Sequence, residues 1–177
     1  MKVILISGKA QHGKDTSAVM IRRGLEDEGY KVVVAHYADL LKYICRTFFG
    51  WDGEKDEYGR QLLQYVGTDV IRERAPSYWV DFLSDFFSIF SDEWDYAIIP
   101  DTRFPNEISG MREAGFETIH IRVRRDHFES SLTEEQQRHP SETALDAVEP
   151  DFWLINDGSI EDLERRITHW LKENVYE

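Results

Sequence analysis

The stretch GKAQHGK at residues 8–14 constrains the fold of this chain more than any other feature. It follows an apolar run, residues 3–6, and fits the pattern G-x-x-x-x-G-K of a phosphate-binding loop. That pattern belongs between a buried strand and a helix, and residues 14–28 have the apolar spacing of a helix. Glycines allow the backbone amides to curl around a phosphate, and the helix N-terminus adds positive potential. The sequence therefore predicts a strand, a phosphate loop and a helix in that order.

Short apolar runs and helical periods alternate along the rest of the chain. We expect further strands at residues 32–35, 97–101, 118–123 and 152–155. We expect helices at residues 39–49, 60–74, 79–90 and 106–114 and after residue 158. This alternation predicts one α/β domain, residues 1–177, with helices on both faces of a five-stranded parallel sheet. Ligands of such sheets bind beyond the carboxyl ends of the strands.

The composition narrows the classes of partner. Acidic residues outnumber basic ones by 34 to 21, which gives a formal net charge of −13. Affinity for a nucleic-acid backbone comes from Lys and Arg that neutralise phosphates, so we expect no nucleic-acid polymer as partner. The single cysteine, Cys45, excludes an intrachain disulfide and a cysteine-based zinc site. The first apolar run is too short for a signal peptide or a membrane span, so we expect a cytoplasmic protein without membrane association.

Two carboxylates are candidate magnesium ligands. In phosphate loops the residue after the lysine is usually Ser or Thr, whose hydroxyl binds Mg²⁺, but here Lys14 is followed by Asp15 and then Thr16. The Asp15 carboxylate is also a hard oxygen ligand, and it could equally serve as a favourable charge at the helix N-terminus. Asp101 ends the expected third strand, where a second magnesium partner or a helix cap is typical.

Arginines gather in one part of the chain. Six of the 14 arginines lie between residues 103 and 138, a stretch without lysine. Arg103 follows Asp101 closely, and Arg124 and Arg125 end the expected fourth strand. Residues 126–150 are polar and lack a sustained period, which is typical of a mobile lid. Because guanidinium groups pair bidentately with phosphate oxygens, we expect Arg103 and at least one of Arg124 and Arg125 to act on a transferring phosphoryl group.

Five motifs in one order give the chain a family resemblance. They are GKDT at 13–16, YADLLK at 37–42, RQLLQYVGT at 60–68, DTRFPNE at 101–107 and HPSETALD at 139–146. Together they resemble the deoxynucleoside monophosphate kinases of the viral and bacterial type, over nearly the whole chain. The loop, Leu41-Lys42, Asp101-Thr102-Arg103 and the Ser-Glu and Leu-Asp pairs of residues 141–146 are also similar to animal-type phosphomevalonate kinase.

The resemblance implies a fold, cofactors and site residues. The fold would be a three-layer sandwich of the nucleoside-monophosphate-kinase type with a lid at about 124–150. ATP and Mg²⁺ would lie over the loop residues Gly8, Lys9, Gln11, His12, Gly13, Lys14, Asp15 and Thr16. Asn156 and Gly158 lie in the turn that would border adenine. The acceptor would contact Lys42, Arg60, Thr68, Asp69, Arg72, Trp79 and Arg103.

The reaction implied is phosphoryl transfer from ATP to a small phosphorylated nucleotide. The acceptor phosphate is already anionic, so positioning and charge neutralisation suffice, with Lys14, Arg103 and a lid arginine as the catalytic groups. Two alternatives stay open: another phosphorylated acceptor such as phosphomevalonate, and a nucleotide-dependent switch. The base preference stays open as well. The aromatic stripe of residues 79–90 is expected in the core, although a dimer face is the other option, so the chain is a monomer or a homodimer.

Overall fold

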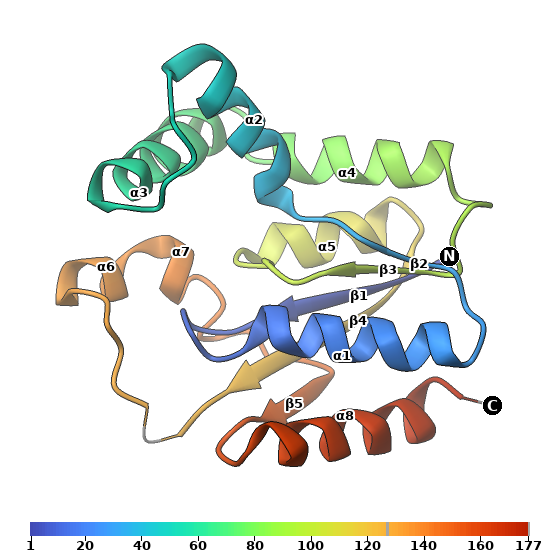
Figure 1. Cartoon of the computed structure of the whole chain (residues 1–177). Helices are drawn as coiled ribbons and strands as arrows, with labels where there is room; N and C mark the ends of the chain where they lie inside the picture. The colour runs from blue at the N-terminus through green and yellow to red at the C-terminus, as the bar shows by residue number, and fades with distance from the viewer. Residues whose placement is uncertain (127, 177) are drawn as a thin grey trace.

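The computed structural model describes residues 1–126 and 128–176, and this part of the chain contains one five-stranded parallel sheet (Figure 1). The strand order is β2-β3-β1-β4-β5. The strands are β1 (Lys2–Ser7), β2 (Val32–Val34), β3 (Tyr96–Ile99), β4 (Glu117–Arg124) and β5 (Phe152–Ile155). The α/β class, the parallel sheet and all the predicted strand positions are thereby confirmed, within one or two residues at each end.

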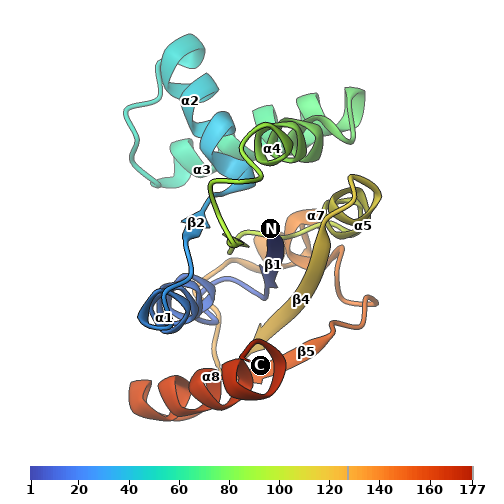
Figure 2. The same cartoon turned by 90° about the vertical axis from the view of Figure 1, so that its right-hand side faces the viewer.

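Helices cover both faces of the sheet. They are α1 (Lys14–Asp27), α2 (Tyr37–Phe49), α3 (Glu57–Gln64), the π-helix η1 (Tyr65–Arg72), α4 (Tyr78–Ile89), α5 (Pro105–Glu113), α6 (Glu134–Arg138), α7 (Pro140–Thr143) and α8 (Ile160–Asn174). Figure 2 shows α1 and α8 on one side of the strands and α4 and α5 on the other. In the described part of the chain no helix is both long enough and apolar enough to cross a membrane.

The central strand β1 explains how two cores share one sheet. Residues 3–6 are fully buried, and alternate side chains point to opposite faces of a strand. Ile4 and Ile6 pack with α1 and α8, while Val3 and Leu5 pack with α4 and α5. The continuous apolar run is therefore what a strand covered on both faces requires. This packing fixes the carboxyl end of β1, from which the phosphate loop emerges.

Two predicted elements differ from the structure. The helix predicted at 60–74 starts at Glu57, because Asp56 caps it by accepting the Gly59 amide, and it continues as the π-helix η1. The segment predicted to lack regular structure, residues 126–150, contains the short helices α6 and α7. Each has fewer than two turns, too few for a hydrophobic period to be visible in the sequence.

The aromatic stripe of α4 is only half in the core. Trp79, Leu83 and Phe87 are buried, while the parallel row of Phe82, Phe86 and Phe90 is between 36% and 45% exposed. The Phe86 and Phe90 rings contact each other and Trp94. Residues at this spacing cover a wider arc than the sheet can bury, so the prediction of a core stripe was too broad.

Candidate functional site

The phosphate loop lies between β1 and α1, as its motif requires. Gly8 (φ +149°) and Gly13 (φ +99°) adopt backbone conformations that side chains rarely allow. A Cβ on Gly8 would lie 2.5 Å from the Val123 carbonyl oxygen, and one on Gly13 would lie 2.5 Å from Nδ2 of Asn156. Gln11 is the one non-glycine residue with positive φ (+63°) among the described residues. These positions keep the loop tightly curled against β4 and β5.

Lys14 begins α1 and turns back over the loop. Its Nζ donates to the carbonyl oxygens of Gly8 (2.8 Å) and Lys9 (2.9 Å). Burial lowers the Lys14 pKa to about 8, with a further lowering from Arg103 and an opposing effect of Glu142. The loop thus carries a fixed ammonium group close to the amides that would cradle a phosphate.

The turn predicted to border adenine, residues 156–158, contacts the phosphate loop through Asn156. Asn156 donates its Nδ2–H to the His12 carbonyl oxygen (2.9 Å), and the Arg125 amide donates to His12 Nδ1 (3.2 Å). Gly158 lies just before α8, and a Cβ there would lie 2.5 Å from the Asp162 carboxylate. Asn156 therefore has a visible role in holding the loop, and a role of this turn toward adenine stays a prediction.

The two candidate magnesium ligands occupy different surroundings. Asp15 and Thr16 are exposed in the first turn of α1. Asp101 lies just after β3, and its two oxygens accept the Tyr37 and Ala38 amides at 3.0 Å each. It therefore caps α2, while burial raises its pKa. The described residues contain no group of three or more His, Cys, Asp or Glu side chains arranged for a metal. Since Mg²⁺ is commonly held by one or two carboxylates and substrate phosphates, both remain candidates.

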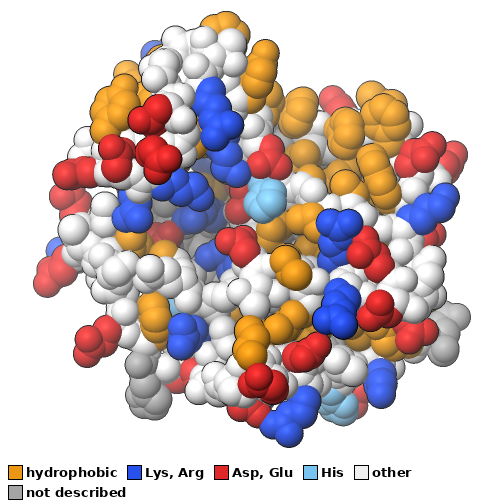
Figure 3. Space-filling model, in the orientation of Figure 1, with side chains coloured by type: hydrophobic (Ala, Val, Ile, Leu, Met, Phe, Trp, Pro, Cys, Tyr) orange, Lys and Arg blue, Asp and Glu red, His pale blue; other side chains and the backbone are white. Residues whose placement is uncertain are grey.

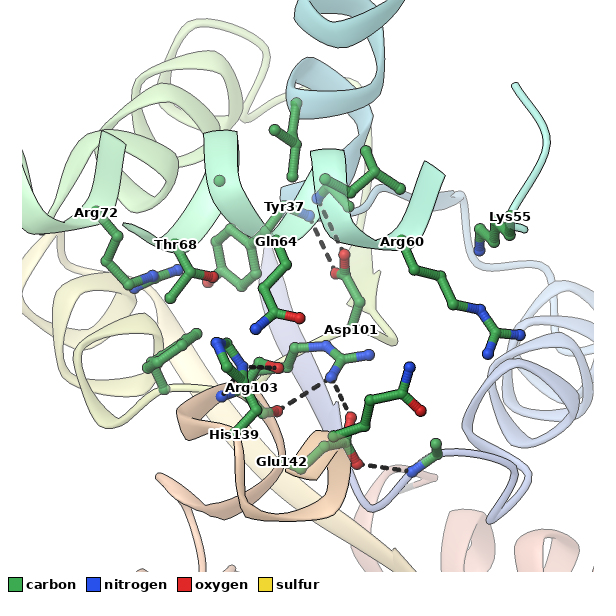
Figure 4. A pocket seen from close by; sticks show the side chains of 18 of the residues that line it. Tyr37, Lys55, Arg60, Gln64, Thr68, Arg72, Asp101, Arg103, His139 and Glu142 are labelled. Carbon is green, nitrogen blue, oxygen red and sulfur yellow. Dashed lines mark hydrogen bonds and ion pairs between the residues drawn. The ribbon is translucent and has the colours of Figure 1, made fainter. Parts of the chain in front are cut away.

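A cavity of about 400 Å³ lies beside the phosphate loop, between η1 and α7. Figure 3 shows a hollow below α2 and α3 with basic side chains in it. Of the predicted acceptor residues, the structure brings six to its lining: Lys42, Arg60, Thr68, Arg72, Trp79 and Arg103. Figure 4 shows Arg60, Thr68 and Arg72 reaching down from α3 and η1 toward Asp101, Arg103 and Glu142. Asp69 is not in the lining, and its carboxylate lies 3.9 Å from His139 Nε2.

Arg72 is held rigidly at the wall of this cavity. Its Nη2 donates to Glu107 Oε1 (2.5 Å), and its guanidinium lies 3.8 Å over the Phe104 ring. The second oxygen of Glu107 accepts the amides of Arg103 (2.6 Å) and Phe104 (3.1 Å), because α5 begins at Pro105 and Glu107 is its third residue. Burial raises the Glu107 pKa to about 7, against the lowering effect of Arg72. The buried Glu107 carboxylate therefore holds both the side chain of Arg72 and the backbone of Arg103 in place.

The remaining predicted arginines are placed differently. Arg103 donates from Nη1 to Glu142 Oε1 (2.5 Å) and to the Ser141 carbonyl oxygen (3.0 Å). Arg125 lies 4.6 Å over the Phe128 ring and lines another cavity, of about 670 Å³, together with Lys9 and His12. Arg124 is exposed and paired with Asp126 (2.5 Å), and it lines neither of these cavities.

Sequence reasoning left several lining residues without a role. Lys55 and Gln64 add a charge and an amide to the cavity between η1 and α7, and Glu142 contacts the phosphate loop. Lys55 lies between the helices predicted at residues 39–49 and 60–74, outside the five motifs. Glu142 belongs to the HPSETALD motif, which was a usable signal, although the motif alone does not reveal its partners.

Comparison with known proteins yields a family match and curated relatives. A family model described as deoxynucleotide monophosphate kinase matches residues 42–167. The deoxynucleotide monophosphate kinase of Enterobacteria phage T4 is 35% identical over 115 residues, covering 64% of this chain and 45% of that protein. The protein of the same name from Escherichia phage RB69 is 34% identical, with 44% of it covered. The chain thus spans less than half the length of these two relatives.

A putative deoxynucleotide monophosphate kinase of Acanthamoeba polyphaga mimivirus is 26% identical and covers 94% of both chains. Solved structures show the likeness in fold. The Mycobacterium tuberculosis APS kinase CysC in complex with AMPPNP and APS matches with a TM-score of 0.53, 15% identity and 97% of each chain covered. Shikimate kinase from Aquifex aeolicus matches with a TM-score of 0.54 and 14% identity, also over 97% of each chain. The fold is therefore that of the small phosphate-loop kinases.

Proposed function

Because this chain belongs to the deoxynucleotide monophosphate kinase family, we propose that it transfers the γ-phosphoryl group of ATP to the phosphate of a deoxynucleoside monophosphate. The observation that carries this proposal is the basic cavity next to the phosphate loop. Five of its lining residues are cationic: Lys42, Lys55, Arg60, Arg72 and Arg103. Its acidic lining residues already accept hydrogen bonds from the protein, as Asp101, Glu107 and Glu142 do. Lys42, Arg72 and Arg103 are each paired with one carboxylate, whereas Lys55 and Arg60 form no ion pair with the described residues. A dianionic phosphate therefore meets cationic donors there.

ATP and Mg²⁺ fit the residues at the loop. The curl at Gly8 and Gly13 leaves no space for side chains, which is what a backbone cradle for phosphates requires. Asp15 lies in the first turn of α1, and Asp101 caps the start of α2. Both carboxylates are hard oxygen ligands, and they would hold Mg²⁺ together with the phosphates. Bound there, the ion would supply neutralisation of charge on the β- and γ-oxygens.

The protein side chains would act mainly by position. Lys14 would hold the β- and γ-oxygens of the donor, and Arg72 and Lys42 would hold the acceptor phosphate. Arg103 lies between the two and would neutralise the oxygens of the group in transfer. The acceptor oxygen is already ionised, so no general base is needed. Thr68 and Trp79, whose Nε1 donates to the Gly67 carbonyl oxygen (3.1 Å), would border the base.

The substrate class and the domain organisation belong to the same proposal. We expect a small-molecule nucleotide as substrate, in a single domain of residues 1–177, with residues 124–150 covering the site. The −13 net charge disfavours a nucleic-acid polymer as partner. A cytoplasmic location and a monomer or homodimer remain predictions.

The test is an acceptor-dependent assay of ADP release. ATP and Mg²⁺ are supplied with each common deoxynucleoside monophosphate, each ribonucleotide counterpart, or phosphomevalonate, and Lys14→Ala serves as the blank. We expect turnover with one or more deoxynucleotides and loss of turnover when EDTA removes Mg²⁺. Turnover with phosphomevalonate alone would move the chain to a different acceptor. Acceptor-independent hydrolysis alone would favour a nucleotide-dependent switch.

A further inference from the structure

The Glu142 carboxylate bridges the phosphate loop and Arg103. Its Oε2 accepts the Ala10 amide (3.0 Å), and its Oε1 accepts Nη1 of Arg103 (2.5 Å). The Glu142 side chain is only 8% exposed, so these two donors replace most of its contact with water. Figure 4 shows both contacts on the floor of the cavity. A single carboxylate therefore joins the donor side of the site to the arginine that lies between donor and acceptor.

The backbone that carries Glu142 is itself fixed to the loop. Lys9 Nζ donates to the Glu142 carbonyl oxygen (2.5 Å) and pairs with Asp146 (2.6 Å). Asp146 also accepts Nη2 of Arg122 (2.8 Å), a buried residue of β4. Three connections thus hold residues 142–146 against the phosphate loop and the sheet. The Glu142 side chain is presented from a fixed platform and not from a free loop.

From this geometry we infer that Glu142 is a positioning residue, which sets Arg103 at a defined place relative to the phosphate loop. This inference rests on the proposed kinase function and adds a residue to it. In the described part of the chain, the side-chain hydrogen bonds of Arg103 to Glu142 and Ser141 both use Nη1. Nε and Nη2 are left for the oxygens of a phosphoryl group, in a fork that Glu142 orients.

The arrangement also opposes a different role, in which Glu142 occupies a phosphate position and leaves when ATP binds. Departure would have to break the contacts to Ala10 and Arg103 while Lys9 still held the Glu142 backbone. It would also leave the Arg103 side chain anchored only through the Ser141 carbonyl oxygen. The positioning role keeps every one of these contacts during turnover.

The first experiment is steady-state kinetics of Glu142→Gln. A carboxamide has one acceptor oxygen, so its NH₂ must face either the Ala10 amide or Arg103, donor against donor. We expect kcat to fall by roughly tenfold or more, with the KM for ATP changed by less than about threefold. The aspartate side chain of Glu142→Asp is one methylene shorter, so the kcat of this variant should fall as well. Glu26→Gln is the matched control, because it breaks an exposed carboxylate–arginine pair of α1 outside the lining of both cavities and should leave kcat unchanged.

The second experiment is a double-mutant cycle. If Glu142 acts through Arg103, Glu142→Gln should have little further effect on kcat in an Arg103→Ala background. The kcat of these weakly active variants is measured by the transfer of a radiolabelled γ-phosphate to the acceptor. Independently of turnover, the NMR signal of the Arg103 Nε–H group should weaken or shift in Glu142→Gln, while thermal unfolding shows that the fold is retained.

Two results would overturn the inference. One is a Glu142→Gln protein with the wild-type kcat and Arg103 signal, and the other is a full, additive loss in the Arg103→Ala background. A rise in kcat or in ATP affinity would instead assign Glu142 as an inhibitory anion. The kinetic results require an active wild-type protein, so inactivity of the wild type with every acceptor would count against the proposed function. The Arg103 signal would still test the positioning role in that case.

Discussion

Lys14 and Glu107 are charged residues at places where burial works against their charge, and their pKa values move in opposite directions. The Lys14 pKa falls to about 8 and the Glu107 pKa rises to about 7. Both side chains are nevertheless surrounded by partners suited to the charged form: carbonyl oxygens for Lys14, and Arg72 with two amides for Glu107. The site therefore combines rigid geometry with groups that titrate close to neutral pH.

Replacement of Lys14 tests the donor side of the site. We expect Lys14→Ala to lower kcat by about a hundredfold or more, because its ammonium would act on charge that develops during transfer. The measurement is acceptor-dependent ADP release at saturating ATP. Lys172→Ala, which removes an exposed lysine of α8 far along the chain, is the control and should retain wild-type turnover. Near-normal kcat in Lys14→Ala would remove Lys14 from the mechanism.

The lowered Lys14 pKa predicts an alkaline limit to activity. Lys14 is charged below about pH 8 and becomes neutral above it, so kcat/KM for ATP should fall as the pH rises through about 8. Arginine stays protonated throughout this range, so Lys14→Arg should be less active but should not show this fall. The measurement is a pH profile of kcat/KM from pH 6 to 9.5. The same alkaline fall in both proteins would assign it to another group.

The phosphate loop could be predicted from the sequence because its motif is local, with every required residue within nine positions. The role of Glu142 could not, since its partners Ala10 and Arg103 are 132 and 39 positions away. Asp101 illustrates the intermediate case. Its place after a strand was predictable, but its hydrogen bonds depend on where the fold places the start of α2.

At the scale of elements, strands were predicted better than helices. Each strand is a run of apolar residues whose burial on two faces leaves a clear pattern. The π-helix η1 was predicted as ordinary helix, because apolar spacing does not distinguish hydrogen bonds to the fourth and the fifth residue. Gly67 of η1 lies against Leu41 of α2, and a Cβ on Gly67 would lie 2.6 Å from Leu41 Cδ2. The packing of η1 on α2 therefore depends on having glycine, without a side chain, at this position.

Gly59 in α3 provides a test of such packing. Alanine is normally favoured over glycine in a helix by about 1 kcal/mol. At Gly59, however, a Cβ would lie 2.0 Å from the Glu54 carbonyl oxygen and 2.7 Å from the Trp51 ring nitrogen. Backbone cannot move aside as a flexible side chain can, so we expect the clash to dominate and Gly59→Ala to lower the free energy of unfolding by about 1–3 kcal/mol.

The measurement is urea unfolding, with Gly29→Ala as the control. Gly29 has a positive φ (+89°) but no atom within 4 Å of a Cβ, so only backbone strain of about 1 kcal/mol is expected there. A stabilised Gly59→Ala protein would show that helix propensity dominates and that the Glu54 segment yields.

At the scale of the whole molecule, an acidic exterior surrounds a basic cavity. The net charge is −13, yet the cavity beside the phosphate loop is lined by five Lys and Arg residues. The total charge of a sequence does not fix the sign of the potential in a cleft, because low-dielectric walls focus the field of nearby groups. The five cations come from α2, α3 and η1 and from the segments that precede α3 and α5, which only the complete fold brings together.

The segment proposed to cover the site is unevenly anchored, and hydrogen exchange should reveal this. No residue of α6 is buried, whereas α7 and the residues after it are tied to the phosphate loop through Lys9 and Glu142. We expect α6 amides to exchange close to unprotected rates in the free protein and more slowly with a nonhydrolysable ATP analogue and an acceptor. Amides of β1 should be protected in both states. Protection of α6 equal to that of β1 without nucleotide would contradict a closing role.

The strand order also has a consequence for synthesis of the protein on the ribosome. β1 pairs with β3 and β4, and β2 pairs with β3, so none of these ladders can form before Tyr96–Ile99 has been made. Until then the apolar residues 3–6 of β1 have no strand beside them and stay exposed to other chains. A nascent chain that already contains the whole phosphate loop is therefore a natural client for chaperones.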